Sequence, residues 1–220
     1  MRNVIVCRKR HGKGSLYQED GTYYEGEWHE GRPHGKGTNW GETGIYTGEW
    51  SDGRMEGRGI FQLSNGDNYE GQVAPANEIE FSLLDGTEYA EGKFHGKGKY
   101  TFVDGSYYEG NFVRGQVTGR GKYVGSSGDV LEGDFRNSYL HGMGRSQTAV
   151  SHAFFLVPLS SALMPLTRSF SGRQEGVIKE GFWMDGCLER KGRIDSPRGD
   201  NYIGDFRRGR FEGRGKFKFK

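Results

Sequence analysis

Cysteine, proline and long apolar runs are scarce in this chain, which has 2 cysteines and 5 prolines among its 220 residues. Cys7 and Cys187 lie near opposite ends of the sequence, so we expect no structural disulfide and a reducing compartment. No stretch approaches the roughly 20 apolar residues that span a bilayer. The first residues contain too short an apolar run for a signal peptide. The default expectation is a cytoplasmic protein.

An excess of one charge is also lacking. The 31 basic and 29 acidic residues leave a net charge of +2, which predicts no bulk electrostatic binding of nucleic acid. Hydrophobic residues make up only 33% of the chain, so no thick core is expected. Glycine, in contrast, contributes 39 residues and aromatic residues 14%. The glycines fall at fixed intervals, which indicates ordered turns and close backbone approach rather than a flexible linker.

A block of the form Tyr-x-Gly-x-Trp/Phe, followed by a turn glycine and then Gly-x-Gly, recurs with a period of about 23 residues. The expected repeat starts are Tyr24, Tyr46, Tyr69, Tyr89, Tyr108, Leu131, Lys179 and Tyr202. Residues 11–14 form the tail of a further unit whose front is missing or degraded. A unit this short cannot bury a core by itself, so the sequence predicts a linear stack of small units.

Each unit combines two strand signals with a turn between them. The alternation of Tyr, Gly and Trp or Phe with polar residues is typical of a strand with one apolar face. A turn such as residues 51–54 separates the two halves, and a pair such as Asn65-Gly66 separates successive units. Asn-Gly and Asp-Gly favour tight hairpin turns, because both positions must accept positive φ. We therefore expect an all-β fold, an elongated single-layer antiparallel β-meander of about eight stacked β-hairpins.

Two segments break the period. Between residues 73 and 84 the Gly-x-Gly half is lost, and the unit starting at Tyr89 runs directly into residues 95–98, so these units look shortened or fused. Residues 151–171 are apolar and unlike the repeat. They are expected to form a degenerate repeat or a simple loop, or alternatively to enter a bilayer surface or a partner's pocket. The expected organisation is repeats over 1–150, an apolar insertion over 151–173 and two further repeats over 174–220.

These features resemble the MORN (membrane occupation and recognition nexus) repeat family, over roughly residues 11–150 and 174–220. The departures include Leu131 and Lys179 at the tyrosine position and Arg190 at a glycine position. The resemblance implies a module for interactions. Members of the family are associated with membrane junctions, phospholipid binding, and scaffolding of cytoskeletal, ciliary and flagellar structures. Some carry the repeats beside a kinase or methyltransferase domain, for which this sequence shows no counterpart.

The repeated rings form one candidate binding surface, termed here the ring column. Its members are Tyr24, Trp28, Tyr46, Trp50, Tyr69, Tyr108, Phe112, Phe135, Trp183, Tyr202 and Phe206. Packing of the sheet is the expected role, because little else could stabilise a single layer. The rings are also candidates for lining a groove that takes an apolar peptide or helix.

The residues inside Gly-x-Gly form a second candidate surface, termed here the cation column. Its members are Lys13, Lys36, Arg58, Lys97, Arg120, Lys191 and Arg214, with Met143 at the remaining position. An acidic column follows the tyrosines at Glu25, Glu70, Glu91, Glu109, Glu132 and Glu180. Both columns are expected opposite the rings. They either neutralise one another across neighbouring strands or leave a cationic stripe for anionic headgroups or an acidic partner.

No enzyme or cofactor motif is recognisable. The Gly-x-Gly segments lack the third glycine and the following helix of a dinucleotide-binding loop. His11, His34, His95 and His141 precede Gly-x-Gly, but equivalent positions in adjacent repeats lie about 9.6 Å apart. A zinc site needs nitrogens about 2 Å from one ion, so no metal site is expected.

The sequence therefore predicts a non-enzymatic scaffold that docks a cytoskeletal or membrane-associated protein along its groove, in the cytoplasm or at a cilium, cytoskeletal element or membrane. The alternative is a peripheral membrane protein that binds anionic phospholipids, such as phosphoinositides, through the cation column. A third hypothesis is a module that acts beside an enzyme supplied in trans. Residues 216–220 alternate Lys and Phe, and two copies could pair there edge to edge as a homodimer.

Overall fold

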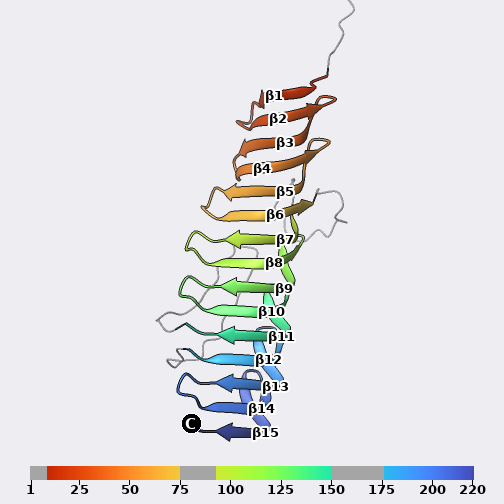
Figure 1. Cartoon of the computed structure of the whole chain (residues 1–220). Helices are drawn as coiled ribbons and strands as arrows, with labels where there is room; N and C mark the ends of the chain where they lie inside the picture. The colour runs from red at the N-terminus through yellow and green to blue at the C-terminus, as the bar shows by residue number, and fades with distance from the viewer. Residues whose placement is uncertain (1–8, 75–92, 150–175) are drawn as a thin grey trace, which may run out of the picture. The chain divides into compact units, whose positions relative to one another are not determined.

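The computed structural model describes residues 9–74, 93–149 and 176–220, and all regular structure among them is β-strand (Figure 1). The strands are β1 (Gly12–Tyr17), β2 (Tyr23–His29), β3 (Arg32–Gly41), β4 (Gly44–Ser51), β5 (Arg54–Leu63), β6 (Asn68–Ala74), β7 (Lys93–Thr101), β8 (Tyr107–Val113), β9 (Gln116–Val124), β10 (Val130–Arg136), β11 (Tyr139–Gln147), β12 (Ile178–Met184), β13 (Cys187–Asp195), β14 (Asn201–Arg207) and β15 (Arg210–Lys218). The repeat start at Tyr89, the acidic Glu91, Cys7 and the apolar stretch at 151–171 lie outside the described residues.

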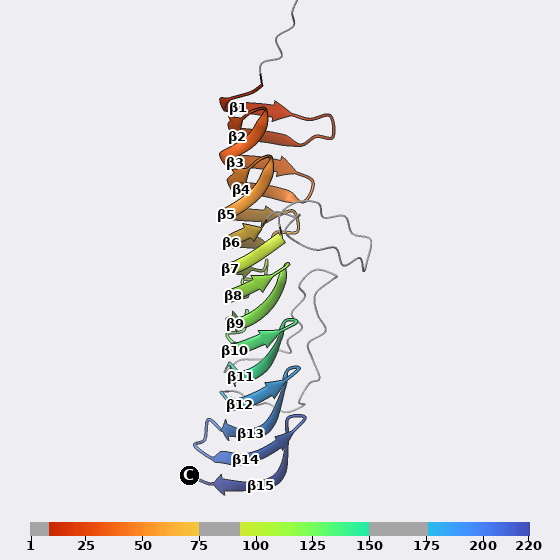
Figure 2. The same cartoon turned by 90° about the vertical axis from the view of Figure 1, so that its right-hand side faces the viewer.

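The fifteen strands belong to one antiparallel sheet in which strand order follows chain order. The predicted single-layer meander of hairpins is therefore confirmed. The chain divides into two compact units, Met1–Gly96 and Lys97–Lys220, with the boundary inside β7. Within each unit, consecutive strands lie side by side (Figure 1), and many of the strands bend along their length (Figure 2).

Among the described residues, the turn between the two strands of a repeat has two residues with positive φ. In β2–β3 these are Glu30 at 48° and Gly31 at 86°, and in β4–β5 they are Asp52 at 53° and Gly53 at 86°. The same pair of conformations recurs at 114–115, 137–138, 185–186 and 208–209. This is the type I′ geometry, whose twist matches that of the flanking strands. The predicted turns inside the repeats are thus confirmed.

The turns between hairpins differ from the prediction. In the described turns Asp20-Gly21 and Asn65-Gly66, only the glycine has positive φ, at 88° and 92° respectively. The amide of Gly21 donates to the carbonyl of Gln18 at 3.1 Å, and the Asp20 carboxylate accepts from the amide of Thr22 at 2.9 Å. The expectation of positive φ at both positions is wrong here. These loops are longer than the two-residue turns inside the repeats and need one left-handed residue. The Asp20 side chain fixes the backbone that follows it by accepting a hydrogen bond.

The second half of the Tyr69 repeat is β7. The ring of Phe94 stacks on Tyr69 with centroids 3.8 Å apart. A Cβ on Gly96, whose φ is 64°, would meet the Gln72 side chain, as one on Gly57 would meet Glu49. The Gly-x-Gly half of this repeat is therefore not lost. Residues 75–92 separate its two strands in the sequence, which is tolerated because loop-closure entropy grows slowly with loop length.

Candidate binding surfaces on the two faces of the sheet

Four tyrosines of the ring column, Tyr24, Tyr46, Tyr108 and Tyr202, each lie over a pair of glycines. Gly26 faces Gly37 across β2 and β3, and a Cβ on either would collide with Tyr24. The Tyr24 hydroxyl donates to the carbonyl of Glu27 at 3.0 Å. Burial, with a smaller contribution from the Glu27 carboxylate, raises the pKa of Tyr24 to about 12. The paired glycines thus create a flat place on the sheet that a neutral, hydrogen-bonded phenol fills.

The tryptophans of the ring column join each hairpin to the one before it. The indole of Trp28 donates to the carbonyl of Gly14 at 2.9 Å, that of Trp50 to Gly37 at 3.2 Å, and that of Trp183 to Gly144 at 2.9 Å. In each case the acceptor is the second glycine of the preceding Gly-x-Gly. Phenylalanine at the same position in other repeats has no donor for this bond. Tryptophan therefore adds a polar link to an otherwise apolar contact between repeats.

The side chains of the ring column are buried on one face of the sheet. Ten of its eleven members are at most 6% exposed, and Tyr202 is half-buried. The rings contact one another within and between repeats, as Tyr24 does with Trp28 at 5.2 Å and with Trp50 at 5.0 Å between centroids. Rings buried to this degree offer little area to a partner. Their role as a docking groove stays a prediction, and the surfaces with accessible side chains lie elsewhere.

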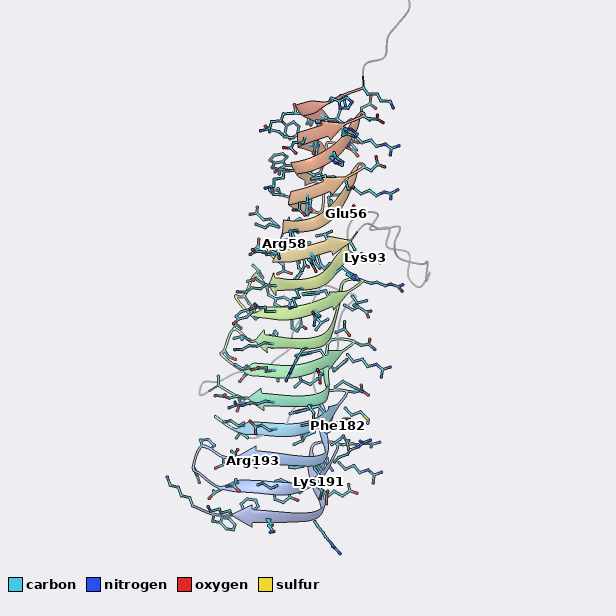
Figure 3. All side chains as sticks on the ribbon, turned by 45° about the vertical axis from the view of Figure 1, so that its right-hand side comes forward. Glu56, Arg58, Lys93, Phe182, Lys191 and Arg193 are labelled. Atoms are coloured by element: carbon cyan, nitrogen blue, oxygen red, sulfur yellow. The ribbon has the colours of Figure 1, made fainter. Side chains whose placement is uncertain are left out.

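The cation column lies on the opposite face, and all of its members are exposed; Arg58 on β5 and Lys191 on β13 are labelled in Figure 3. The residues opposite the column are not the expected acidic column. Lys36 faces Glu49, and Arg120 faces Asp134. The expected partners lie two positions further along, where Glu132 faces Lys122 and Arg145. The assignment of cross-strand partners from the sequence was wrong by two residues, because the register places Gly opposite Gly.

The acids that face the cation column are used by the backbone. The Glu27 carboxylate accepts from the amide of Lys36 at 3.2 Å, and that of Glu49 accepts from the amide of Arg58 at 2.9 Å. These amides follow left-handed glycines, and each carboxylate occupies the space where the glycine Cβ would lie. Lys36 and Arg58 consequently make no ion pair with any described residue.

Lys191 is different from these two cations. Its ammonium lies 2.6 Å from Asp205, and a hydrogen bond from this lysine lowers the pKa of the Asp205 carboxyl. The Asp205 carboxylate also accepts from the amide of Arg214 at 3.2 Å. Neutralisation of the face across strands therefore occurs at Lys191 but not at Lys36 or Arg58.

A row of rings crosses the same face in the first unit, and is termed here the aromatic ladder: Tyr17, Tyr23 and Trp40. Tyr17 faces Tyr23, and Tyr23 faces Trp40, with centroids 6.4 Å and 5.1 Å apart. Tyr17 is 74% and Trp40 37% exposed, and Tyr23 between them is half-buried. These rings were not predicted as a binding surface, because they lie outside the repeated block. Tyr17 and Trp40 lie four residues from Lys13 and Lys36, which was the available signal that these two rings share the polar face.

A carboxylate lies at the aromatic ladder. The Tyr23 hydroxyl donates to the Glu25 carboxylate at 3.2 Å. Residues 14–31 and 37–53, which carry the ladder, contain acids such as Glu19 and Glu42 but no lysine or arginine. The ladder therefore combines exposed π surface with negative charge.

The repeats that lack tyrosine cover their glycines in another way. In the β12–β13 hairpin, Gly181 faces Gly192, and a Cβ on either glycine would lie about 3 Å from the Leu188 side chain. Lys179, at the tyrosine position, is half-buried, and burial lowers the pKa of its ammonium. Leu140 covers the glycines of the β10–β11 hairpin similarly. A leucine from the second strand thus replaces the tyrosine of the first.

Three histidines form a row that the sequence argument did not contain. The His11 and His29 rings have centroids 5.0 Å apart, and His29 and His34 5.4 Å. All three side chains are exposed. As the side chains stand, the described residues include no group of three or more His, Cys, Asp or Glu arranged to hold a metal ion. The described residues also include no helix long and apolar enough to cross a bilayer.

An open antiparallel sheet of hairpins, with paired glycines under tyrosines, defines a β-repeat protein. The family model of the MORN repeat matches residues 9–23, 24–40, 46–68, 88–107, 108–130, 132–149 and 202–220. These matches cover more than half of the chain, which therefore belongs to the MORN repeat family. No curated protein matches the chain significantly. MORN repeats are generally non-catalytic scaffolds. The β12–β13 hairpin lies outside the matches but keeps the glycine-to-glycine register.

Proposed function

We propose that this chain is a non-enzymatic MORN-repeat scaffold that binds a protein partner at a cytoskeletal or membrane-apposed site. The observation that carries the proposal is the aromatic ladder. Exposed rings at neighbouring positions of adjacent strands are a typical contact surface, because rigid aromatic side chains contribute large area with little loss of conformational entropy. The buried ring column supports this surface from the other side of the sheet instead of forming it.

The chemistry of the ladder selects a segment of a partner protein that carries arginine or lysine. A guanidinium or ammonium over an aromatic ring contributes about 0.5–2 kcal/mol, depending on desolvation. The Glu25 carboxylate at the ladder and the absence of lysine and arginine from residues 14–31 and 37–53 complement such a segment in charge. An acidic segment would meet repulsion at the same place.

A peptide-display selection against the purified full chain tests this proposal. We expect the selected peptides to be enriched in arginine or lysine. Their binding should weaken at least about tenfold in Trp40→Ala and Tyr17→Ala, as expected for rings at the centre of a contact. Phe219→Ala is a matched control, because Phe219 is 73% exposed, close to the 74% of Tyr17. Circular dichroism and thermal melting confirm that each variant is folded.

Two results would overturn the assignment. One is a selection without basic enrichment, and the other is binding that Trp40→Ala and Tyr17→Ala leave unchanged while Phe219→Ala reduces it. Either result would mean that the partner surface lies away from the ladder, and the ring column would return as the candidate.

The second candidate function, binding of anionic phospholipids, is favoured by the unpaired cations. Lys36 and Arg58 are exposed and have no ion pair among the described residues. Flotation with phosphoinositide-containing liposomes at about 0.05 and 0.15 M salt tests it, because screening tightens over this range. Lys36→Gln with Arg58→Gln should abolish flotation at the higher salt, whereas Lys191→Gln removes a cation that Asp205 already neutralises and should change it little. Equal loss in both variants would indicate non-specific attraction.

A further inference from the structure

The row of His11, His29 and His34 lies at one end of the first unit, on β2, β3 and the residue before β1. His29 stands between the other two, with ring centroids 5.0 Å and 5.4 Å away. No repeat position predicts His29, so the sequence offered only histidines at equivalent positions of adjacent repeats, such as His11 and His34. The structure places the His29 ring between these two.

The ring separations match those of imidazoles that share an ion. Two imidazoles bound at tetrahedral angles, each with its nitrogen about 2.1 Å from zinc, have centroids about 5 Å apart. His11 and His34 come from strands two apart, about 9.6 Å at the backbone. An imidazole carries its ion about 6 Å from its own Cβ, so two such side chains can meet at a point between the strands. The backbone separation alone therefore does not forbid a shared ion.

We propose that His11, His29 and His34 bind one borderline transition-metal ion, such as Zn²⁺, Cu²⁺ or Ni²⁺, through their ring nitrogens. Imidazole is the ligand that these ions prefer in proteins, and solvent completes the coordination. The nitrogens do not converge as the side chains stand, so the rings turn about their side-chain torsions when the ion binds. All three are exposed, so no packing opposes this movement.

The charges near the row are mixed. Arg10 lies over the Trp28 ring at 4.9 Å from its centroid, and Lys9 pairs with Glu30 at 3.7 Å. Arg32, which faces His29 across the strands, pairs with Asp52 at 2.9 Å. All three cations are thus held by other groups, and Glu30 adds a carboxylate on the turn next to His29.

Copper binding to the full chain, prepared without a histidine tag, tests the proposal. We expect one equivalent of Cu²⁺ to quench tryptophan fluorescence, and the electron paramagnetic resonance spectrum to show coupling to at least two imidazole nitrogens. Zn²⁺ should compete for the same site. His29→Asn should weaken binding at least about tenfold, because even removal of a residue that only hydrogen-bonds to a metal ligand causes a loss of this size. His11→Asn and His34→Asn should each weaken it and lower the number of coupled nitrogens by one.

His95→Asn is the matched control, since His95 is also exposed in the first unit and precedes a Gly-x-Gly. Coupling to one nitrogen, or equal affinity in the wild type and His29→Asn, would overturn the proposal, as would equal loss in His95→Asn. The site is independent of the aromatic ladder, so Trp40→Ala should bind the metal normally whether or not it binds peptides.

Discussion

The guanidinium of Arg190 lies over the ring of Phe182, 4.6 Å from its centroid, and Arg190 has a backbone φ of 60°. In the β4–β5 hairpin the same two positions hold Gly57, with φ of 78°, and Glu49. There the Glu49 carboxylate fills the space beside the glycine and accepts the amide of Arg58 at 2.9 Å. A side chain fits the left-handed position in β13 because the opposite acid has been replaced by a flat ring.

This relationship predicts that Phe182→Glu and Arg190→Gly are coupled. Arg190→Gly relieves about 1–2 kcal/mol of left-handed strain, but loses a cation–π contact of about 0.5–1 kcal/mol and increases unfolded-state entropy by about 0.4–1 kcal/mol. The single variant should therefore be close to neutral. Phe182→Glu alone should destabilise, because the Arg190 Cβ occupies the place of the carboxylate. The double variant restores the glycine–acid pair. It should be more stable, by about 1 kcal/mol, than the sum of the two single-variant effects predicts.

Urea unfolding of the four proteins in the cycle measures this coupling. Phe182→Leu with Arg190→Gly is a suitable control, because leucine cannot accept a hydrogen bond from the Lys191 amide. Additive effects in the Glu cycle, or equal coupling in the Leu cycle, would show that the two positions do not act as a pair.

The sequence predicted the strands and the turns inside the repeats because both depend on local rules. Alternation places Tyr46, Gly48 and Trp50 on one face of β4, and Asp52-Gly53 accepts the two left-handed residues that the turn requires. The family resemblance followed from the same periodic positions, since glycines such as Gly48 and Gly59 are required by close contacts within their own hairpin.

The aromatic ladder, the histidine row and the partner strand of Tyr69 could not be predicted in this way. Each depends on which residues face one another across strands. The register shifts between Gly26 and Trp28, so counting along one strand does not give the partner on the next. His29 lies beyond that shift, and β7 lies beyond residues 75–92. The sequence period determines which residues lie on each face of a strand, whereas strand pairing determines which residues of the next strand they contact.

Gly48→Ala and Gly21→Ala should separate packing from backbone strain. A Cβ on Gly48 would lie 2.6 Å from the Cα of Gly59, on the facing strand, and would also collide with Tyr46. We expect a loss of about 3 kcal/mol or more, because two backbones cannot move apart without breaking the hairpin. Gly21 has φ of 88° with nothing within 4 Å of its Cβ position, so its alanine should lose only about 1–2 kcal/mol. Thermal unfolding measures both, and equal losses would contradict the steric account.

Stability should fall at alkaline pH because the buried tyrosines resist ionisation. Burial raises the pKa of Tyr24 and of Tyr108 from 10.0 to about 12. A folded-state pKa above the unfolded value means that the contribution is complete below pH 10 and is lost as pH rises toward about 12. Urea midpoints across this range should therefore decline. The decline should be shallower in Tyr24→Phe with Tyr108→Phe than in the wild type, and unchanged in the exposed control Tyr17→Phe. Similar slopes in all three would contradict the assignment to buried phenols.

Trp50→Phe should weaken the link between consecutive hairpins more than its lost area suggests. The substitution removes the indole donor that binds the Gly37 carbonyl at 3.2 Å, a hydrogen bond that contributes about 1 kcal/mol. It also leaves a gap in the ring column, where Trp50 is only 6% exposed. A total loss of about 2 kcal/mol is expected. Trp40→Phe is the control, because Trp40 lies on the exposed face and phenylalanine still provides an aromatic ring. Its free energy of unfolding should change by no more than about 0.5 kcal/mol. Because the bond joins β4 to β3, amide hydrogen exchange in β3 should accelerate in Trp50→Phe alone. Acceleration confined to β4 would show that the indole stabilises its own hairpin and does not couple it to the preceding one.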